Sequence, residues 1–195
     1  MILKNHYWYF DKAISKDFIN MIINICEKKN KKQAQIDEFI EDKSRRDCLI
    51  SFIDDKKIYD ILNPFIHLAN KNAEWNFEID WNESCQYTEY NKSQFYSYHA
   101  DSFCEPYKNH DNKNFENKVR KLSLTLQLTD PSEYEGGDFY FKYLTDKGVI
   151  EEKVEQAKEL GTIIVFPSFV FHKVSPITKG TRKSLVNWTL GYPFK

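Results

Sequence analysis

Two segments in the first third of the chain carry apolar residues at helical spacing. The first is residues 16–29, with Ser15 as its N-cap. Its apolar stripe is formed by Ile14, Phe18, Ile22 and Ile25. The second, residues 56–72, contains Pro64, which predicts a kink or two shorter helices. The polar sequence of residues 30–43 predicts a solvated connector.

From residue 75 onward the apolar and polar positions alternate with a period of two, which indicates half-buried strands. In residues 122–129 four leucines form one face of such a strand, and Ser123, Thr125, Gln127 and Thr129 form the other. The predicted strands are residues 1–10, 47–53, 75–81, 85–90, 94–101, 122–129, 139–144, 149–155, 161–166, 169–174 and 182–190. Two helical regions followed by many short strands predict an α+β chain that is mainly β, a double-stranded β-helix (jelly roll).

We expect a single domain over residues 1–195, with the jelly-roll core at about 75–195 and helical and strand support from 1–74. The formal charge is −1, from 28 basic and 29 acidic residues, which argues against a nucleic-acid partner bound through counterion release. The four cysteines include no CxxC pair and predict reduced thiols in the cytoplasm. No signal peptide or membrane span is predicted, and no surplus apolar face indicates an oligomeric state.

Candidate metal ligands stand in the aromatic-rich segment 90–102, YNKSQFYSYHADS. His99 and Asp101 are two residues apart, so in a strand their side chains point to the same face. A second histidine, His172, lies in the predicted strand 169–174 with several strands intervening. Two histidines and one carboxylate are the set that holds non-heme Fe(II). The alternative for His172 is a buried histidine bonded to a backbone group.

Arg182 occupies the predicted strand that follows His172, and alternation points it into the barrel. The residues that share its face are Ser184, Val186 and Trp188. An unpaired buried guanidinium is costly, and no carboxylate in that strand supplies a partner. A bound dicarboxylate suits the planar fork of arginine, while a surface ion pair is the alternative.

Together these residues resemble the iron- and 2-oxoglutarate-dependent oxygenases, specifically the prolyl 4-hydroxylase-like branch. The resemblance runs from about residue 75 to the C-terminus. Its motifs are Tyr90-x-x-x-Gln94-x-Tyr96-x-x-His99-x-Asp101, YEGGDF at 134–139 and FPS…HKVSPITKGTRKSLVNW at 166–188. The phage and bacterial members, called PKHD-type hydroxylases, are the most similar. The chain departs from the pattern at Ser93, where the motif has glycine, and at Arg182, where the collagen-type enzymes have lysine. Both departures loosen the assignment of a substrate group.

The resemblance implies a role for nine residues. The iron ligands, which are also the catalytic residues, would be His99, Asp101 and His172. The residues at 2-oxoglutarate would be Arg182 on the distal carboxylate, Tyr90 through a hydrogen bond, and Gln127. The residues that face the substrate or line its pocket would be Tyr96, Arg120 and Trp188.

The implied activity is Fe(II)- and 2-oxoglutarate-dependent hydroxylation of a C–H bond by O2, above all in a prolyl residue of a protein or peptide. Succinate and CO2 would be the coproducts, and ascorbate a supporting reductant. Alternatives are hydroxylation of another residue or a small molecule, and nucleic-acid demethylation, whose enzymes have a different arginine pattern and a more basic charge. A non-catalytic metal-binding barrel is a third, opposed by the presence of every ligand. The polar stretch 103–118 predicts a lid or substrate rim.

Overall fold

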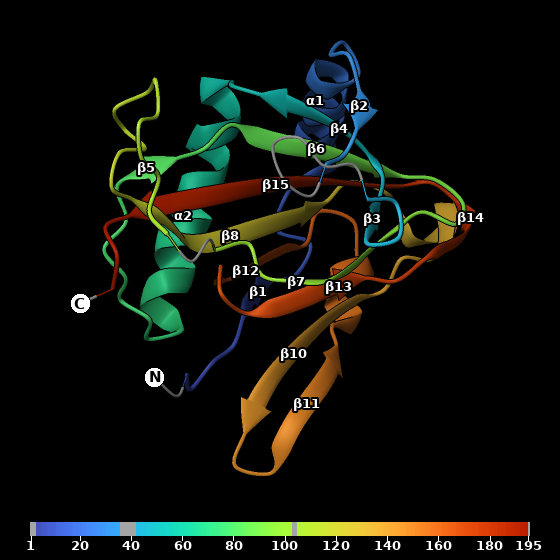
Figure 1. The fold of residues 1–195 in the computed structure, drawn as a ribbon. Coiled ribbons are helices and arrows are strands. Elements are labelled where there is room, and N and C mark those ends of the chain that lie inside the picture. Colours follow the sequence, from blue (N-terminus) through green and yellow to red (C-terminus); the bar gives the residue numbers. More distant parts are fainter. Residues whose placement is uncertain (1–2, 36–41, 103–104, 195) are drawn as a thin grey trace.

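The computed structural model describes residues 3–35, 42–102 and 105–194, and its two main antiparallel sheets face each other (Figure 1). The larger sheet has the order β1 (Trp8–Phe10), β12 (Ile163–Pro167), β8 (Val119–Gln127), β15 (Arg182–Gly191), β6 (Cys85–Tyr90), β4 (Leu49–Ile53) and β2 (Lys32–Gln33), with β5 (Trp81–Asn82) paired to β15. The second sheet has the order β11 (Gly148–Lys153), β10 (Phe139–Thr145), β13 (Phe171–Val174), β7 (Phe95–His99) and β3 (Arg46–Asp47). The small pair β9 (Tyr134–Gly136) and β14 (Ile177–Gly180) was not predicted as strands. This arrangement is the predicted jelly roll.

The polar and apolar faces of β8 separate two cores. Leu122, Leu124 and Leu126 belong to the core that the larger sheet forms with the helices. The opposite face of β8 looks toward the second sheet, where a second core includes Phe139, Phe141 and Phe166. The strand is therefore covered on both sides, as the middle layer of three. Its polar face is enclosed within the jelly roll.

Both predicted helices are present and lie on the outer face of the larger sheet (Figure 1). The N–H of Phe18 donates to Oγ of Ser15, which confirms the predicted cap of α1 (Lys16–Cys26). Phe18 itself is exposed, so its place in the buried stripe was wrong. α2 (Lys56–Asn72) continues through Pro64 as one helix, and the prediction of two pieces was wrong. Its buried side chains hold it in place on both sides of the proline.

The predicted strand over residues 75–81 is wrong except at its end, where β5 begins. Burial still alternates, with Trp75 and Phe77 inside. The backbone is instead held by the side-chain amide of Asn70, which donates to the carbonyl of Phe77 and accepts from its N–H, both at 2.9 Å. A side chain thus takes the place of a neighbouring strand.

The described part of the connector 30–43 contains β2, and its residues 36–41 lie outside the described residues. Tyr107 anchors the described part of the 103–118 stretch, exchanging backbone hydrogen bonds with Lys118 and Asn117. Cys26, Cys48 and Cys85 are free and buried, whereas Cys104 lies outside the described residues. No helix in the described ranges is long and apolar enough to cross a membrane.

Candidate metal and cosubstrate site

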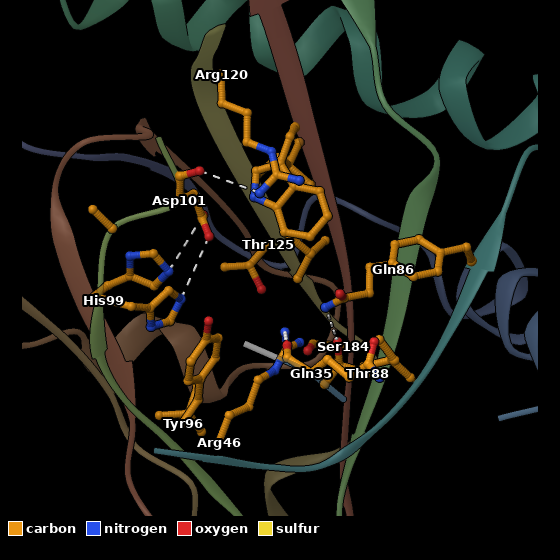
Figure 2. A pocket seen from close by; sticks show the side chains of 18 of the residues that line it. Gln35, Arg46, Gln86, Thr88, Tyr96, His99, Asp101, Arg120, Thr125 and Ser184 are labelled. Atoms are coloured by element: carbon orange, nitrogen blue, oxygen red, sulfur yellow. Dashed lines mark hydrogen bonds and ion pairs between the residues drawn. The ribbon is translucent and has the colours of Figure 1, made fainter. Parts of the chain in front are cut away.

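β7 and β13 bring the three predicted metal ligands together. The two strands pair with His172 opposite His99, and Asp101 follows just beyond the end of β7. One ligating atom from each residue lies within 4.8 Å of the others. Each Nε2 is 3.6 Å from a different carboxylate oxygen of Asp101, and Figure 2 shows the ring of His99 turned toward it. The predicted strand 94–101 therefore ends two residues early, yet the ligands still converge.

Hydrogen bonds fix the tautomer of both imidazoles. Nδ1 of His99 donates to the carbonyl of Ser97 at 2.8 Å, and Nδ1 of His172 donates to that of Val170 at 3.0 Å. Because a carbonyl only accepts, Nδ1 carries the proton in each neutral ring, which leaves Nε2 as the atom that can ligate a metal. Burial and the neighbouring His99 lower the pKa of His172 to about 4, so this ring is neutral at pH 7. This donor set fits a divalent iron.

Asp101 is held as a buried carboxylate by its surroundings. Its backbone N–H donates to the carbonyl of Ser168 at 2.8 Å, and Ser123 Oγ donates to Oδ2 at 2.7 Å. Burial opposes ionisation of Asp101. The positive charge that His172 and His99 carry when protonated, together with a hydrogen bond from His99, outweighs burial and holds the pKa of Asp101 far below its usual range. The carboxylate is therefore ready to ligate a cation at any ordinary pH.

A cavity of about 990 Å³ opens between the sheets in front of the triad. Arg182 lies in its wall, almost fully buried, with Tyr90 as its register partner on β6. Nη1 of Arg182 donates to Ser184 Oγ at 3.4 Å, and its Nε has no hydrogen-bond partner. Among the described residues no carboxylate forms an ion pair with Arg182. The guanidinium can therefore bind an anion in the cavity.

Gln127 lies deeper than its predicted role requires. Its Nε2 donates to the carbonyl of Thr129 and to the hydroxyl of Tyr134, both at 3.1 Å, and it is not among the residues that line the cavity. Thr125, two residues earlier on the same face of β8, lines the cavity instead. The structure thus brings Thr125, rather than Gln127, to the cavity.

Arg120 and Trp188 form a second part of the cavity wall. Arg120 donates two hydrogen bonds to the carboxylate of Glu83, at 2.7 and 2.6 Å, and its Cζ lies 4.0 Å from the ring centre of Trp188. It also donates to the backbone carbonyl of Asp101 at 3.4 Å. The charge of Arg120 is thus paired within the protein, and the residue braces the loop that carries a metal ligand. Nε1 of Trp188 has no partner.

Tyr96 lies against the metal ligands. Its ring stacks on the imidazole of His99, with centroids 3.5 Å apart, and it lines the cavity. On the other side of the Tyr96 ring lies the guanidinium of Arg46, 4.5 Å from the ring centre. Figure 2 shows Arg46 and Tyr96 entering the cavity from the same edge.

Five residues of the site were not predicted from the sequence. They are Arg46, Glu83, Ser123, Thr125 and Ser168. Ser123 and Thr125 could have been suspected, since they belong to the polar face of a strand whose other face is all leucine. The others sit at strand ends or in turns, where a polar residue is ordinary.

The chain is also similar in sequence to a known protein family. Residues 85–190 match the 2OG-Fe(II) oxygenase superfamily, which is more than half of the chain, and the match includes all three predicted ligands and Arg182. The chain therefore belongs to the 2OG-Fe(II) oxygenase superfamily.

Among curated proteins the chain is similar to PKHD-type hydroxylases, as the motifs indicated. It is 42% identical over 67 residues to one from Gloeothece citriformis, covering 34% of this chain and 28% of that one. It is 33% identical over 103 residues to one from Alteromonas mediterranea, covering 52% and 41%. The chain thus covers less than half the length of these relatives. The resemblance to the PKHD-type branch is confirmed.

Solved structures confirm the jelly-roll fold. A Pseudomonas putida prolyl-4-hydroxylase superimposes with a TM-score of 0.72 at 18% identity, covering 95% of this chain and 93% of that one. The viral collagen prolyl hydroxylase of Paramecium bursaria Chlorella virus-1 gives a TM-score of 0.64 at 18% identity, covering 96% and 97%.

Proposed function

We propose that this protein is an Fe(II)- and 2-oxoglutarate-dependent dioxygenase that hydroxylates a prolyl residue of a peptide or protein. The observation that carries this proposal is the convergence of His99, Asp101 and His172 within 4.8 Å, in the same cavity as a buried Arg182 that pairs with no carboxylate of the described residues. Two imidazoles and a carboxylate suit Fe(II), and a buried guanidinium without a carboxylate partner among the described residues suits a dicarboxylate cosubstrate. The similarity to PKHD-type hydroxylases supports the choice of proline.

Iron, when bound with 2-oxoglutarate, supplies the oxidising chemistry that uses O2 and yields succinate and CO2. The protein residues bind and orient. His99, Asp101 and His172 would hold the metal, and Arg182 with Tyr90 would bind the distal carboxylate of the cosubstrate. Thr125 lies on the same cavity wall as Ser184.

The substrate lies on the open side of the cavity. Trp188 lines the cavity with an aromatic ring that suits a pyrrolidine ring. Tyr96, stacked between His99 and Arg46, limits access of water to the metal. Arg120, paired with Glu83, positions the Asp101 loop and the indole of Trp188. A peptide or protein, rather than a nucleic acid, is the partner that the net charge of −1 favours. Ascorbate would act only to keep the iron reduced.

The test is succinate formation from 2-oxoglutarate with Fe(II), ascorbate and air, against a panel of proline-containing peptides. Mass spectrometry reads each peptide for one added oxygen atom. Asp101→Ala should abolish turnover without unfolding the protein, and Asp146→Ala, at an exposed turn of the β10–β11 hairpin, is the matched control. Iron binding without succinate from any panel member would refute the proposal. Succinate without an oxidised prolyl residue would keep the oxygenase and reject proline.

A further inference from the structure

Arg46 is a second buried cation in the cavity, with no role in the function proposed above. It lies in β3, a strand of two residues that pairs Arg46 with Tyr96 of β7. Only 8% of its surface is exposed, and it lines the cavity. Because Tyr96 separates Arg46 from His99, the guanidinium lies beside the metal centre without contacting a ligand.

The hydrogen bonds of Arg46 leave its charge unmatched. Nε donates to Cys48 Sγ at 3.4 Å and Nη1 to the carbonyl of Gln35 at 3.2 Å, and both partners are neutral. No carboxylate of the described residues forms an ion pair with it. A guanidinium has five N–H donors, so three remain available. Arg120, in the same cavity, differs from Arg46 because its charge is neutralised by two hydrogen bonds to the carboxylate of Glu83.

The other charges at the site cancel without Arg46. Asp101 and Arg182 offset each other, as do a divalent iron and a 2-oxoglutarate dianion. At the rim Glu105 pairs with Lys108 at 3.3 Å. The exposed Lys32 lines the same cavity and adds to the excess of positive charge. A buried cation is stable only when it is paired, so a further anion is missing.

We propose that Arg46 binds a carboxylate carried by the substrate, so that preferred substrates have an anionic group close to the hydroxylated residue. This inference rests on the proposed function and names the substrate class of the same site. The carboxylate has two possible sources, an Asp or Glu side chain next to the target and the carboxylate of a chain end or free amino acid. The free N–H groups of Arg46 suit either one bidentately.

Two matched pairs of probes test the proposal. The first is a proline peptide with Asp beside the proline, against the same peptide with Asn. The second is a peptide ending in proline as the free acid, against its amide. Their affinities are measured by calorimetry on enzyme loaded with Mn(II) and 2-oxoglutarate, so no turnover is needed. We expect the carboxylate member of one pair to bind roughly 10-fold to 100-fold more tightly, which identifies the source.

Arg46→Gln should abolish that preference while leaving 2-oxoglutarate affinity within about 2-fold, because the cosubstrate is held elsewhere. Arg45→Gln is the matched control, since the neighbouring Arg45 is exposed and the same charge is removed. If thermal melting shows that Arg46→Gln does not fold, Arg46→Lys retains the charge but not the fork. It should keep only part of the preference.

Equal binding within both pairs would overturn the proposal, whether or not the enzyme turns over 2-oxoglutarate. It would also be overturned if Arg46→Gln weakened 2-oxoglutarate as much as Arg182→Gln does, because Arg46 would then be a second clamp for the cosubstrate. Failure of the proposed function has a different signature. The wild-type protein would then show no 2-oxoglutarate binding and no succinate with any peptide of the panel.

Discussion

Ser123 donates a 2.7 Å hydrogen bond to the Oδ2 atom of Asp101, and through it β8, an inner strand of the larger sheet, positions a candidate metal ligand. Ser123 Oγ also lies 2.9 Å from Ser168 Oγ, and the carbonyl of Ser168 accepts from the backbone of Asp101. The carboxylate is thus oriented by two segments that are far apart in the chain. Groups of this kind set the affinity of a site without touching the metal.

Ser123→Ala should weaken Fe(II) binding by roughly 10-fold to 100-fold, because Asp101 loses the hydrogen bond that orients it. Anaerobic titration with Fe(II) measures the change. Ser51→Ala is the matched control, since Ser51 is also buried in the larger sheet but its Oγ has no hydrogen-bond partner. Equal iron affinities for the two variants would show that Asp101 needs no such support.

Arg182→Gln should weaken 2-oxoglutarate by about 1.5–3 kcal/mol, the usual contribution of a hydrogen bond to a charged group, and leave iron affinity unchanged. Quenching of tryptophan fluorescence reports the binding, since Trp188 shares the cavity with Arg182. Lys179→Gln serves as a control because that lysine is exposed on β14 and pairs only with Glu135. An unaltered affinity in Arg182→Gln would remove Arg182 from the cosubstrate site.

Glu83→Gln should destabilise the fold by about 3–5 kcal/mol, because it leaves the buried guanidinium of Arg120 without its carboxylate. Both side chains of this pair are at most 15% exposed. Urea denaturation gives the free energy of unfolding. The same change in the exposed Lys4–Glu74 pair, Glu74→Gln, should cost less than about 1 kcal/mol. Similar losses in both variants would contradict the buried character of the first pair.

Glu27 should make stability depend on pH below about 4.5. Partial burial acts to raise its pKa, but hydrogen bonds from Lys183, Lys31 and Tyr87 outweigh it and lower the pKa from 4.5 to about 2. Its folded pKa is the lower one, so its stabilisation is complete above pH 4.5 and is lost as the pH falls toward 2. Thermal melting should show this loss in the wild type and a flatter profile in Glu27→Gln. Parallel profiles would exclude Glu27 as the cause.

The sequence predicted the metal triad because its two signals are local. A spacing of two residues joins His99 to Asp101, and the motif around His172 and Arg182 is contiguous. The strand alternation of β8 and β15 placed Ser184 and Trp188 on the cavity side, where the structure has them. The jelly roll was predictable for the same reason, since its strands are short and regularly patterned. The single domain over residues 1–195 stays a prediction.

Contacts between distant segments could not be predicted. Arg46 stands in a polar stretch that reads as surface, and only the pairing of β3 with β7 brings it to Tyr96. Residues 75–81 have the alternation of a strand, but the side-chain amide of Asn70 pairs with the backbone N–H and carbonyl of Phe77, which a neighbouring strand would otherwise bind. Gln127 lies on the polar face of β8, as predicted, but its side chain donates to Tyr134 and does not line the cavity. Alternation shows which face of a strand a residue occupies, but not which position along that face lies at the cavity.

Strands from the first 74 residues pair along the edges of both main sheets. β1 pairs with β12, β4 pairs with β6, and β3 pairs with β7. A chain shortened to begin at residue 75 would keep every predicted metal ligand. It would leave β12, β6 and β7 without the neighbouring strands that now pair with one of their edges. β12 is entirely buried and strongly apolar, so its bare edge would recruit strands from other molecules. The first 74 residues therefore act as a guard against self-association as well as a support for the barrel.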